Sequence, residues 1–519
     1  MGEEPSPALH VIVLGSGGGP QESNTTAFLV RAASHNWSKS SLVAVDAGVH
    51  LSAITRLLRD ALTSSPPTSF PHTLTSGPFA GLSLPFTSPE ANAAHITRAL
   101  VDTYLFTHPH LDHIAGFVIN TAGLPGTRPK KIAGLPSTIH AFKTHIFNNV
   151  IWPNLSDENN GAGLLTYLRL VEGAARPLVT EKPRAIWEVC DGLLVKTWSV
   201  SHGHCIERHS HRGSSASSAS PRFGSHDASS QASRRDGHPL YAFNHHAQSY
   251  YPPSAPSLWS RRGLPQASPD VQERYCVYDS SAYFIQDADH RCEVLIFGDV
   301  EPDSISLNPR NLGIWQEAAP KVAAGTMAAI FIECSYDDSQ SNDRLYGHLK
   351  PVFVIEELAV LAAETEMARR LQSLESRKRK RMASISDEPG GRPNPGRVTS
   401  SLSSTSTPAE EPVSPKSVKP APVTPAVRAF EAASPDTPHL ATPTDELSLR
   451  EAEELDNGAG VPPRRPLEGL KVVIIHVKER LTDGPDVGET ILRQLREHEQ
   501  EARLGCEFIV SKPGQSFYF

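Results

Sequence analysis

Short apolar runs that end in glycine or polar residues recur along the chain and predict β-strands. The predicted strands are 10–14, 26–31, 42–45, 101–106, 132–140, 187–200, 275–285, 292–297, 328–332, 470–475 and 506–510. Apolar residues at helical spacing predict helices at 49–62, 114–122, 141–150, 352–374 and 486–504. Together these elements indicate an α/β fold.

Two stretches interrupt this pattern. Residues 207–272 and 373–466 are rich in serine and proline, and we expect both to be disordered inserts because they contain little that could form a core. The remaining segments, 8–206, 273–372 and 467–519, together provide enough chain for one large domain. Histidines within the first insert are excluded as metal ligands, because a mobile loop holds no fixed geometry.

The amino-acid composition limits the classes of protein to which this chain can belong. The formal net charge of −8 provides no basic field for nucleic acid. The six cysteines are scattered without a C-x-x-C pair, which predicts reduced thiols and no disulfide framework. Because the chain shows neither a signal-peptide pattern nor an apolar run of about eighteen residues, we expect a cytoplasmic protein without a membrane span. The basic run Arg377–Arg381 could serve nuclear import or be a solvated charge run.

The highest density of chemically reactive side chains lies at His108–His113, in the pattern H-x-H-x-D-H. This cluster follows a predicted strand and precedes a predicted helix, so we expect a strand-to-helix loop. Imidazole nitrogens and carboxylate oxygens are ligands for zinc and related metals. On such a loop, His108 and His110 can reach one metal ion while Asp112 and His113 reach a second. The alternative is a solvated polar loop, or a helix cap at Asp112.

Ligand-type side chains also follow other predicted strands. Two divalent ions about 3.5–4 Å apart can orient a water molecule and neutralise charge during ester hydrolysis, so these side chains predict a two-metal hydrolase. One metal would bind His108, His110 and His202, the other would bind Asp112, His113 and His476, and Asp299 would bridge the two. His348 lies in a further loop of this kind.

A glycine-rich loop, Gly15–Pro20, follows the first predicted strand. It lacks the G-x-x-x-x-G-K-[ST] pattern of a phosphate-binding loop, and no predicted helix follows it. We expect a turn between antiparallel strands. The alternative that this loop lines the functional site stays open.

The segment His108–Gly116, HPHLDHIAG, resembles the metal-binding motif of class II cyclic-nucleotide phosphodiesterases of the metallo-β-lactamase superfamily. Further segments match this resemblance in chain order: LGSGGGP, VDAG, SHG, FGDVEPDS, ECSY, GHLKP and IIHVKE. The resemblance covers nearly all of the chain outside the two inserts. It implies a metallo-β-lactamase-like αββα four-layer sandwich with its site at one edge of the sheets. It also implies hydrolysis of the 3′ bond of cyclic AMP or cyclic GMP to the 5′-monophosphate, with two divalent ions: zinc, manganese or magnesium.

The resemblance also implies roles for individual residues. The departing 3′ oxygen needs a proton, and His348 matches the proton donor of related enzymes, with Glu333 near enough to orient it. A helix cap is the alternative for His348. Asp112 counts as a catalytic residue as well as a ligand. Lys478 could contact the phosphate, and a plain surface lysine fits the sequence equally well.

Other functions compete with this interpretation. A tRNA 3′-end endonuclease shares the ligand order, but the acidic net charge and the lack of a basic glycine-rich arm disfavour it. A regulatory protein on an inactive hydrolase scaffold would show lost ligands, and here the full set is present. The inserts could instead dock kinases or proline-binding domains, and the chain could form homo-oligomers.

Overall fold

The computed structural model describes residues 6–126, 128–173, 186–207, 274–385 and 464–519. One compact unit comprises the chain up to Leu371 together with Arg465–Phe519, and a second comprises Gln372–Arg464. Most of both predicted inserts lies outside the described residues, so their disorder stays a prediction.

Seven strands form the first sheet, in the order β16-β1-β2-β3-β6-β7-β8. Their bounds are β1 Leu9–Gly15, β2 Ala27–Ala32, β3 Leu42–Ala47, β6 Val101–Leu105, β7 Lys130–Gly134, β8 Leu165–Arg169 and β16 Ser516–Tyr518. From β16 to β3 the neighbours are antiparallel, and from β3 to β8 they are parallel. The glycine loop therefore does connect two antiparallel strands, β1 and β2, as predicted.

Seven strands also form the second sheet, in the order β15-β14-β13-β12-β11-β10-β9. Their bounds are β9 Trp187–Cys190, β10 Leu193–Glu207, β11 Arg274–Asp287, β12 Glu293–Phe297, β13 Met327–Glu333, β14 Lys471–Ile475 and β15 Glu507–Val510. From β9 to β12 the pairing is antiparallel, and from β12 to β15 it is parallel. A small separate hairpin pairs β4 (His72–Thr73) with β5 (Ser83–Leu84).

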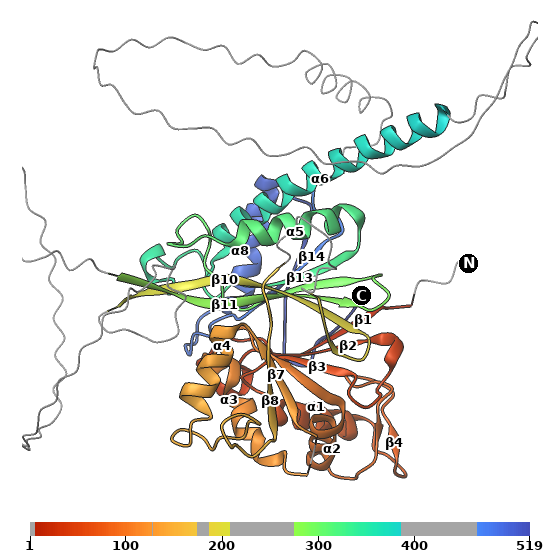
Figure 1. The fold of residues 1–519 in the computed structure, drawn as a ribbon, viewed down its shortest axis with the longest axis vertical. Coiled ribbons are helices and arrows are strands. Elements are labelled where there is room, and N and C mark those ends of the chain that lie inside the picture. Colours follow the sequence, from red (N-terminus) through yellow and green to blue (C-terminus); the bar gives the residue numbers. More distant parts are fainter. Residues whose placement is uncertain (1–5, 127, 174–185, 208–273, 386–463) are drawn as a thin grey trace, which may run out of the picture. The chain divides into compact units, whose positions relative to one another are not determined.

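Helices cover the outer face of each sheet, as Figure 1 shows. Those on the first sheet are α1 Leu51–Ser64, α2 Pro89–His95, α3 Leu111–Asn120 and α4 Pro136–Ala141. Those on the second are α5 Asn311–Ala324, the first turns of α6 Pro351–Ile385, and α8 Val487–Ala502. Short 3₁₀ or π turns are η1 Glu22–Asn24, η2 Ala33–His35, η3 Ile96–Leu100, η4 Thr121–Gly123, η5 Phe142–Ile146 and η6 Asn342–Arg344.

Alternating side chains on the strands separate three apolar cores. On β2, Leu29 packs towards α1–α4, while Phe28 and Val30 point between the two sheets. On β13, Phe331 points between the sheets, and Ile330 packs towards α5, α6 and α8. This alternation follows from the two-residue period of a strand, and it buries both faces of each sheet. The predicted αββα four-layer sandwich is confirmed.

Several predicted elements differ in extent from the observed ones. The strand predicted at 132–140 ends at Gly134, because Pro136 begins α4 there. The strand predicted at 187–200 is a hairpin, in which Gly192 adopts a positive φ of 80° between β9 and β10. The predictions omitted α2, β8, α5 and β16. Helix α5 is hard to recognise because Gly313 and Pro320 interrupt its pattern.

The helix predicted at 352–374 continues to Ile385 as part of α6. The beginning of the predicted insert 373–466 is therefore helical, which corrects that boundary. The basic residues Arg377, Lys378 and Arg379 lie exposed on this helix. Among the described residues, no helix combines the length and the apolar character that crossing a membrane requires.

Candidate metal centre

The predicted ligands lie on loops and turns at one edge of the two sheets. His108 and His110 occupy the loop after β6, and Asp112 and His113 lie in the first turn of α3. Asp299 follows β12 and His476 follows β14. Because parallel strands of one sheet end at the same edge, Asp299 and His476 are brought together in the second sheet. The loop after β6 meets them from the first sheet. His202 lies on β10 at an irregularity between Ser201 and His204.

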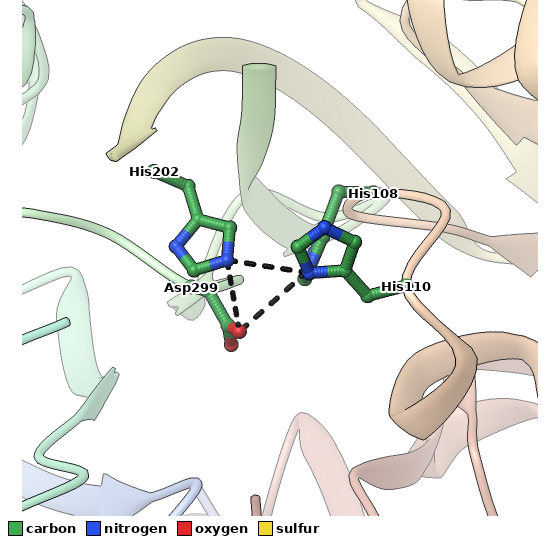
Figure 2. Close-up of side chains that lie close together, drawn as sticks. All are labelled: His108, His110, His202 and Asp299. Carbon is green, nitrogen blue, oxygen red and sulfur yellow. Dashed lines mark hydrogen bonds and ion pairs between the residues drawn. The ribbon is translucent and has the colours of Figure 1, made fainter. Parts of the chain in front are cut away.

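The first cluster contains His108, His110, His202 and Asp299, and their candidate ligand atoms lie within 4.8 Å of one another. Figure 2 shows the side chains converging on the Asp299 carboxylate. Its Oδ2 atom lies 3.6 Å from His108 Nε2 and 3.5 Å from His202 Nε2. His202 Nε2 lies 3.3 Å from His110 Nδ1.

The second cluster contains Asp112, His113, His476 and again Asp299. Here the other oxygen of Asp299, Oδ1, lies 3.2 Å from His113 Nε2 and 3.3 Å from His476 Nε2. Asp112 Oδ2 lies 3.2 Å from His476 Nε2. Asp299 thus presents one oxygen to each cluster, which is the geometry of a bridging carboxylate.

Within the part of the chain that the structure describes, three possible metal-ligand atoms of this centre are buried without a hydrogen-bond partner: His108 Nε2, His113 Nε2 and Asp299 Oδ1. Their residues are at most 1% exposed. Leaving such atoms unpaired in the interior costs free energy, so a native structure needs a partner for them. Two divalent cations, each among imidazole and carboxylate ligands, fit this set.

Burial and neighbouring charges set the ionisation of the cluster. Burial lowers the pKa of His108 well below its ordinary value, and burial likewise lowers the pKa of His110 and of His202 to about 4. Burial opposes charge on Asp299 too, but His476 and His113 outweigh it and hold the pKa of that carboxyl well below its usual range. Neutral imidazoles at His108, His110 and His202 beside an ionised Asp299 are the protonation states that metal binding by the first cluster requires. In the second cluster, burial lowers the pKa of His113, but Asp299 and Asp46 outweigh it and raise that pKa well above its ordinary value.

Asp46 is part of this site although the sequence analysis assigned it no role. Its Oδ2 lies 2.8 Å from His113 Nδ1, and its Oδ1 accepts a 2.8 Å hydrogen bond from the Thr107 backbone N–H. The Thr107 hydroxyl donates to the same carboxylate. The sequence contained a signal, because Asp46 directly follows the predicted apolar strand 42–45.

Ser335 is a second residue that the sequence analysis missed. Its hydroxyl donates to Glu333 Oε2 at 2.7 Å and lies 3.0 Å from His476 Nδ1. Glu333 Oε1 lies 2.8 Å from His348 Nδ1 and accepts from the Val300 backbone N–H. Burial and the charge of Asp299 raise the pKa of Glu333 to about 7.

The structure places His348 at the edge of the metal centre. It is 5% exposed, and burial lowers its pKa to about 4. A third group of possible ligand atoms joins it to His202 and Glu333. Its Nδ1 faces Glu333, which leaves Nε2 as the nitrogen free to meet another group.

The glycine loop lies against the metal centre. A Cβ on Gly18 would come within 2.4 Å of His476 Cε1, so this close approach requires glycine. The Gly18 backbone N–H donates to the Val477 carbonyl, and Lys478 Nζ donates to the Gly18 carbonyl at 3.1 Å. Lys478 and Gly18 line a cavity of 420 Å³. The loop therefore does border the candidate site, the alternative that the sequence left open.

A four-layer sandwich with a paired histidine and aspartate centre defines a hydrolase of the metallo-β-lactamase fold. Residues 9–219 and 263–380 match the family model of the class-II cAMP phosphodiesterases. The chain belongs to this family, and it is a 3′,5′-cyclic-nucleotide phosphodiesterase, as predicted.

Individual relatives agree with this assignment. The chain is 26% identical to the 3′,5′-cyclic-nucleotide phosphodiesterase of Schizosaccharomyces pombe over 353 residues, which cover 67% of this chain and 73% of that protein. It is 25% identical to the protein of the same name from Candida albicans over 398 residues, 69% of this chain and 83% of that protein. Among solved structures, unliganded yeast PDE1 matches with a TM-score of 0.56 at 18% identity, covering 99% of this chain and all (100%) of that one. This last likeness concerns the fold.

Proposed function

We propose that the chain opens the 3′ ester bond of cyclic AMP, and also of cyclic GMP, with two divalent ions held at the described centre. His108, His110 and His202 hold one ion, Asp112, His113 and His476 hold the other, and Asp299 bridges them. The observation that carries this proposal is the position of Asp299, whose two oxygens face the two clusters separately. When bound, the ions lower the pKa of a water molecule and neutralise charge on the phosphate.

Zinc is the ion that suits these histidine-rich clusters best, with manganese and magnesium as alternatives. Asp112 has a side chain that is 27% exposed, against at most 2% for His113, His476 and Asp299. Its carboxylate is therefore the group of the second cluster that can accept a hydrogen bond from the attacking water and orient it.

His348 supplies the proton that the departing 3′ oxygen needs. The Glu333 carboxylate at Nδ1 orients the ring and stabilises the imidazolium form, so that Nε2 can donate. Lys478 has three donors, and only one is needed for the Gly18 carbonyl. A further donor can contact a phosphate oxygen.

The location that fits this function is the cytoplasm. All six cysteines lie among the described residues, and no disulfide joins them there. Cysteines kept as thiols are typical of reducing compartments. The inserts are proposed as docking segments for kinases or proline-binding domains, on composition alone.

A direct assay tests the reaction and its closest rival. Purified protein would be incubated with cyclic AMP, cyclic GMP or a precursor tRNA, each with and without a chelator. We expect 5′-monophosphate from the cyclic nucleotides, no cleavage of the tRNA, and loss of activity with chelator that added zinc or manganese restores. Cleavage of the tRNA with intact cyclic nucleotides would overturn the proposal in favour of an endonuclease.

A further inference from the structure

A cavity of 600 Å³ opens beside the metal centre. His110, His202 and His348 form part of its lining. Its remaining wall comes from other loops and from β11, and includes Tyr278, Ile305, Asn342, Leu345 and Tyr346. A cavity of this size is within the usual range for small-ligand sites.

If the chain catalyses the proposed reaction, on which this inference rests, the nucleoside of the substrate must occupy this cavity. The 3′ oxygen that leaves the phosphorus stays bonded to the ribose, so the ribose must lie on the side of the proton donor. His348 lines the cavity of 600 Å³. The neighbouring cavity of 420 Å³ is lined by Gly18, Ser335 and Lys478, among others, without His348.

Tyr346 is held in an unusual conformation at this cavity. It is 69% exposed, and its φ of 53° lies in the left-handed region that a bulky residue rarely adopts. The next residue, Gly347, also has positive φ, and a Cβ there would lie 2.5 Å from the backbone nitrogen of Gly203. The Gly347 carbonyl is 2.9 Å from His202 Nδ1. The loop is thus tied to the metal centre, and Tyr346 is strained while its ring faces solvent.

Residues held in sparsely populated backbone conformations cluster at active sites and ligand-binding segments. We propose that this cavity is the nucleobase subsite and that the purine stacks on Tyr346. Tyr278 lies on the same cavity, 44% exposed, with its ring centroid 6.3 Å from that of His110. Every nucleobase presents a flat π face, so aromatic side chains bind it without a charged partner.

Asn342 lines this cavity, and its amide can distinguish adenine from guanine. Its amide lies exposed in η6, with no hydrogen-bond partner among the described residues. An asparagine amide pairs with adenine by donating to N7 and accepting from the N6 amino group. Guanine carries an acceptor, O6, where adenine has that donor. We therefore expect cyclic AMP to be preferred over cyclic GMP.

The test compares Tyr346→Gly with Tyr346→Phe. Glycine removes the ring and suits the positive φ, so this variant should fold, whereas phenylalanine keeps the ring. Each would be assayed on cyclic AMP and on methyl 4-nitrophenyl phosphate, a diester without a base. Phe86→Ala, which removes a 47% exposed ring elsewhere, is the matched control.

For Tyr346→Gly we expect KM for cyclic AMP to rise about 5- to 150-fold, the usual range for loss of base stacking, while phenylalanine restores it. Asn342→Ala should lower the ratio of kcat/KM for cyclic AMP over cyclic GMP about fivefold or more. An unchanged KM for Tyr346→Gly, or equal loss on both diesters together with loss of metal, would overturn the subsite. Failure of the unmodified protein to hydrolyse cyclic AMP would instead remove the proposed function, and the subsite with it.

Discussion

Asp46 Oδ2 lies 2.8 Å from Nδ1 of His113, on the opposite side of the ring from the metal centre. This contact leaves Nε2 of His113 as the atom that faces Asp299. Carboxylates that bind the outer nitrogen of a ligating histidine fix its tautomer and orientation, and their loss typically weakens metal binding about 10- to 100-fold.

Asp46→Asn should therefore weaken binding of the ion held by His113 by about that factor. The measurement is a chelator competition titration monitored by elemental analysis of the protein. Asp60→Asn, an exposed carboxylate on α1, is the control and should bind metal normally. Unchanged affinity in the Asp46 variant would mean that Asp299 positions His113 without it.

Asp299→Ala should remove both metal ions, because each of its oxygens faces a different cluster. His476→Ala should remove one ion of about two, since it belongs to the second cluster alone. Elemental analysis after desalting distinguishes these results, with Asp289→Ala on a surface turn as the control. Retention of two ions in the Asp299 variant would contradict the bridging role.

His348→Ala should lower kcat on cyclic AMP by about 10²- to 10⁴-fold and leave metal content unchanged, as expected for loss of a general acid. A nitrophenyl diester has a leaving group that needs no proton, so the variant should recover much of its rate on it. A ligand variant such as His110→Ala should stay slow on both substrates. Loss of metal from this variant would instead make His348 a metal ligand, together with His202 and Glu333.

His10 predicts a pH dependence of stability outside the metal centre. The residue is fully buried and accepts a hydrogen bond from Arg31, and burial lowers its pKa to about 3. In the unfolded chain its pKa is about 6.5. Between these values the unfolded state binds the extra proton, so stability is lost as the pH falls below 6.5.

The loss from His10 is at most about 1.4 kcal/mol per pH unit, the value for one proton. Urea unfolding of the metal-loaded protein at pH 7, 6 and 5 would measure it. His10→Gln cannot take up this proton, so its free energy of unfolding should fall less steeply with pH than that of the unmodified protein. Parallel slopes for the two proteins would show that His10 does not contribute.

The ends of the first predicted insert are adjacent in the second sheet. Glu207 on β10 is the register partner of Arg274 on β11. A short Asn-Gly turn can therefore replace residues 208–273 without stretching either strand. We expect kcat/KM on cyclic AMP to change less than about threefold, because the composition of the insert cannot form a core. Loss of metal from the soluble variant would place part of that segment in the site.

Local pattern in the sequence predicted the side chains that the structure brings together in the candidate metal centre. The sequence shows the cluster His108–His113 and the possible ligands after the other predicted strands, because each of these polar residues ends an apolar run. The family likeness of these motifs also predicted the αββα sandwich. Helix α5 was not predicted, because its glycine and proline weaken the helical period of apolar residues. In the structure, tertiary packing buries Trp315 of this helix.

Only the tertiary structure decided which neighbours support the ligands. Asp46 reaches His113 because β3 pairs parallel with β6, and Ser335 reaches His476 because β13 pairs with β14. Tyr346 likewise comes beside His202 only through the close approach of Gly347 to Gly203. Residues far apart in the chain become neighbours through strand order and close backbone packing. Neither strand order nor backbone packing leaves a periodic pattern of residues in the sequence.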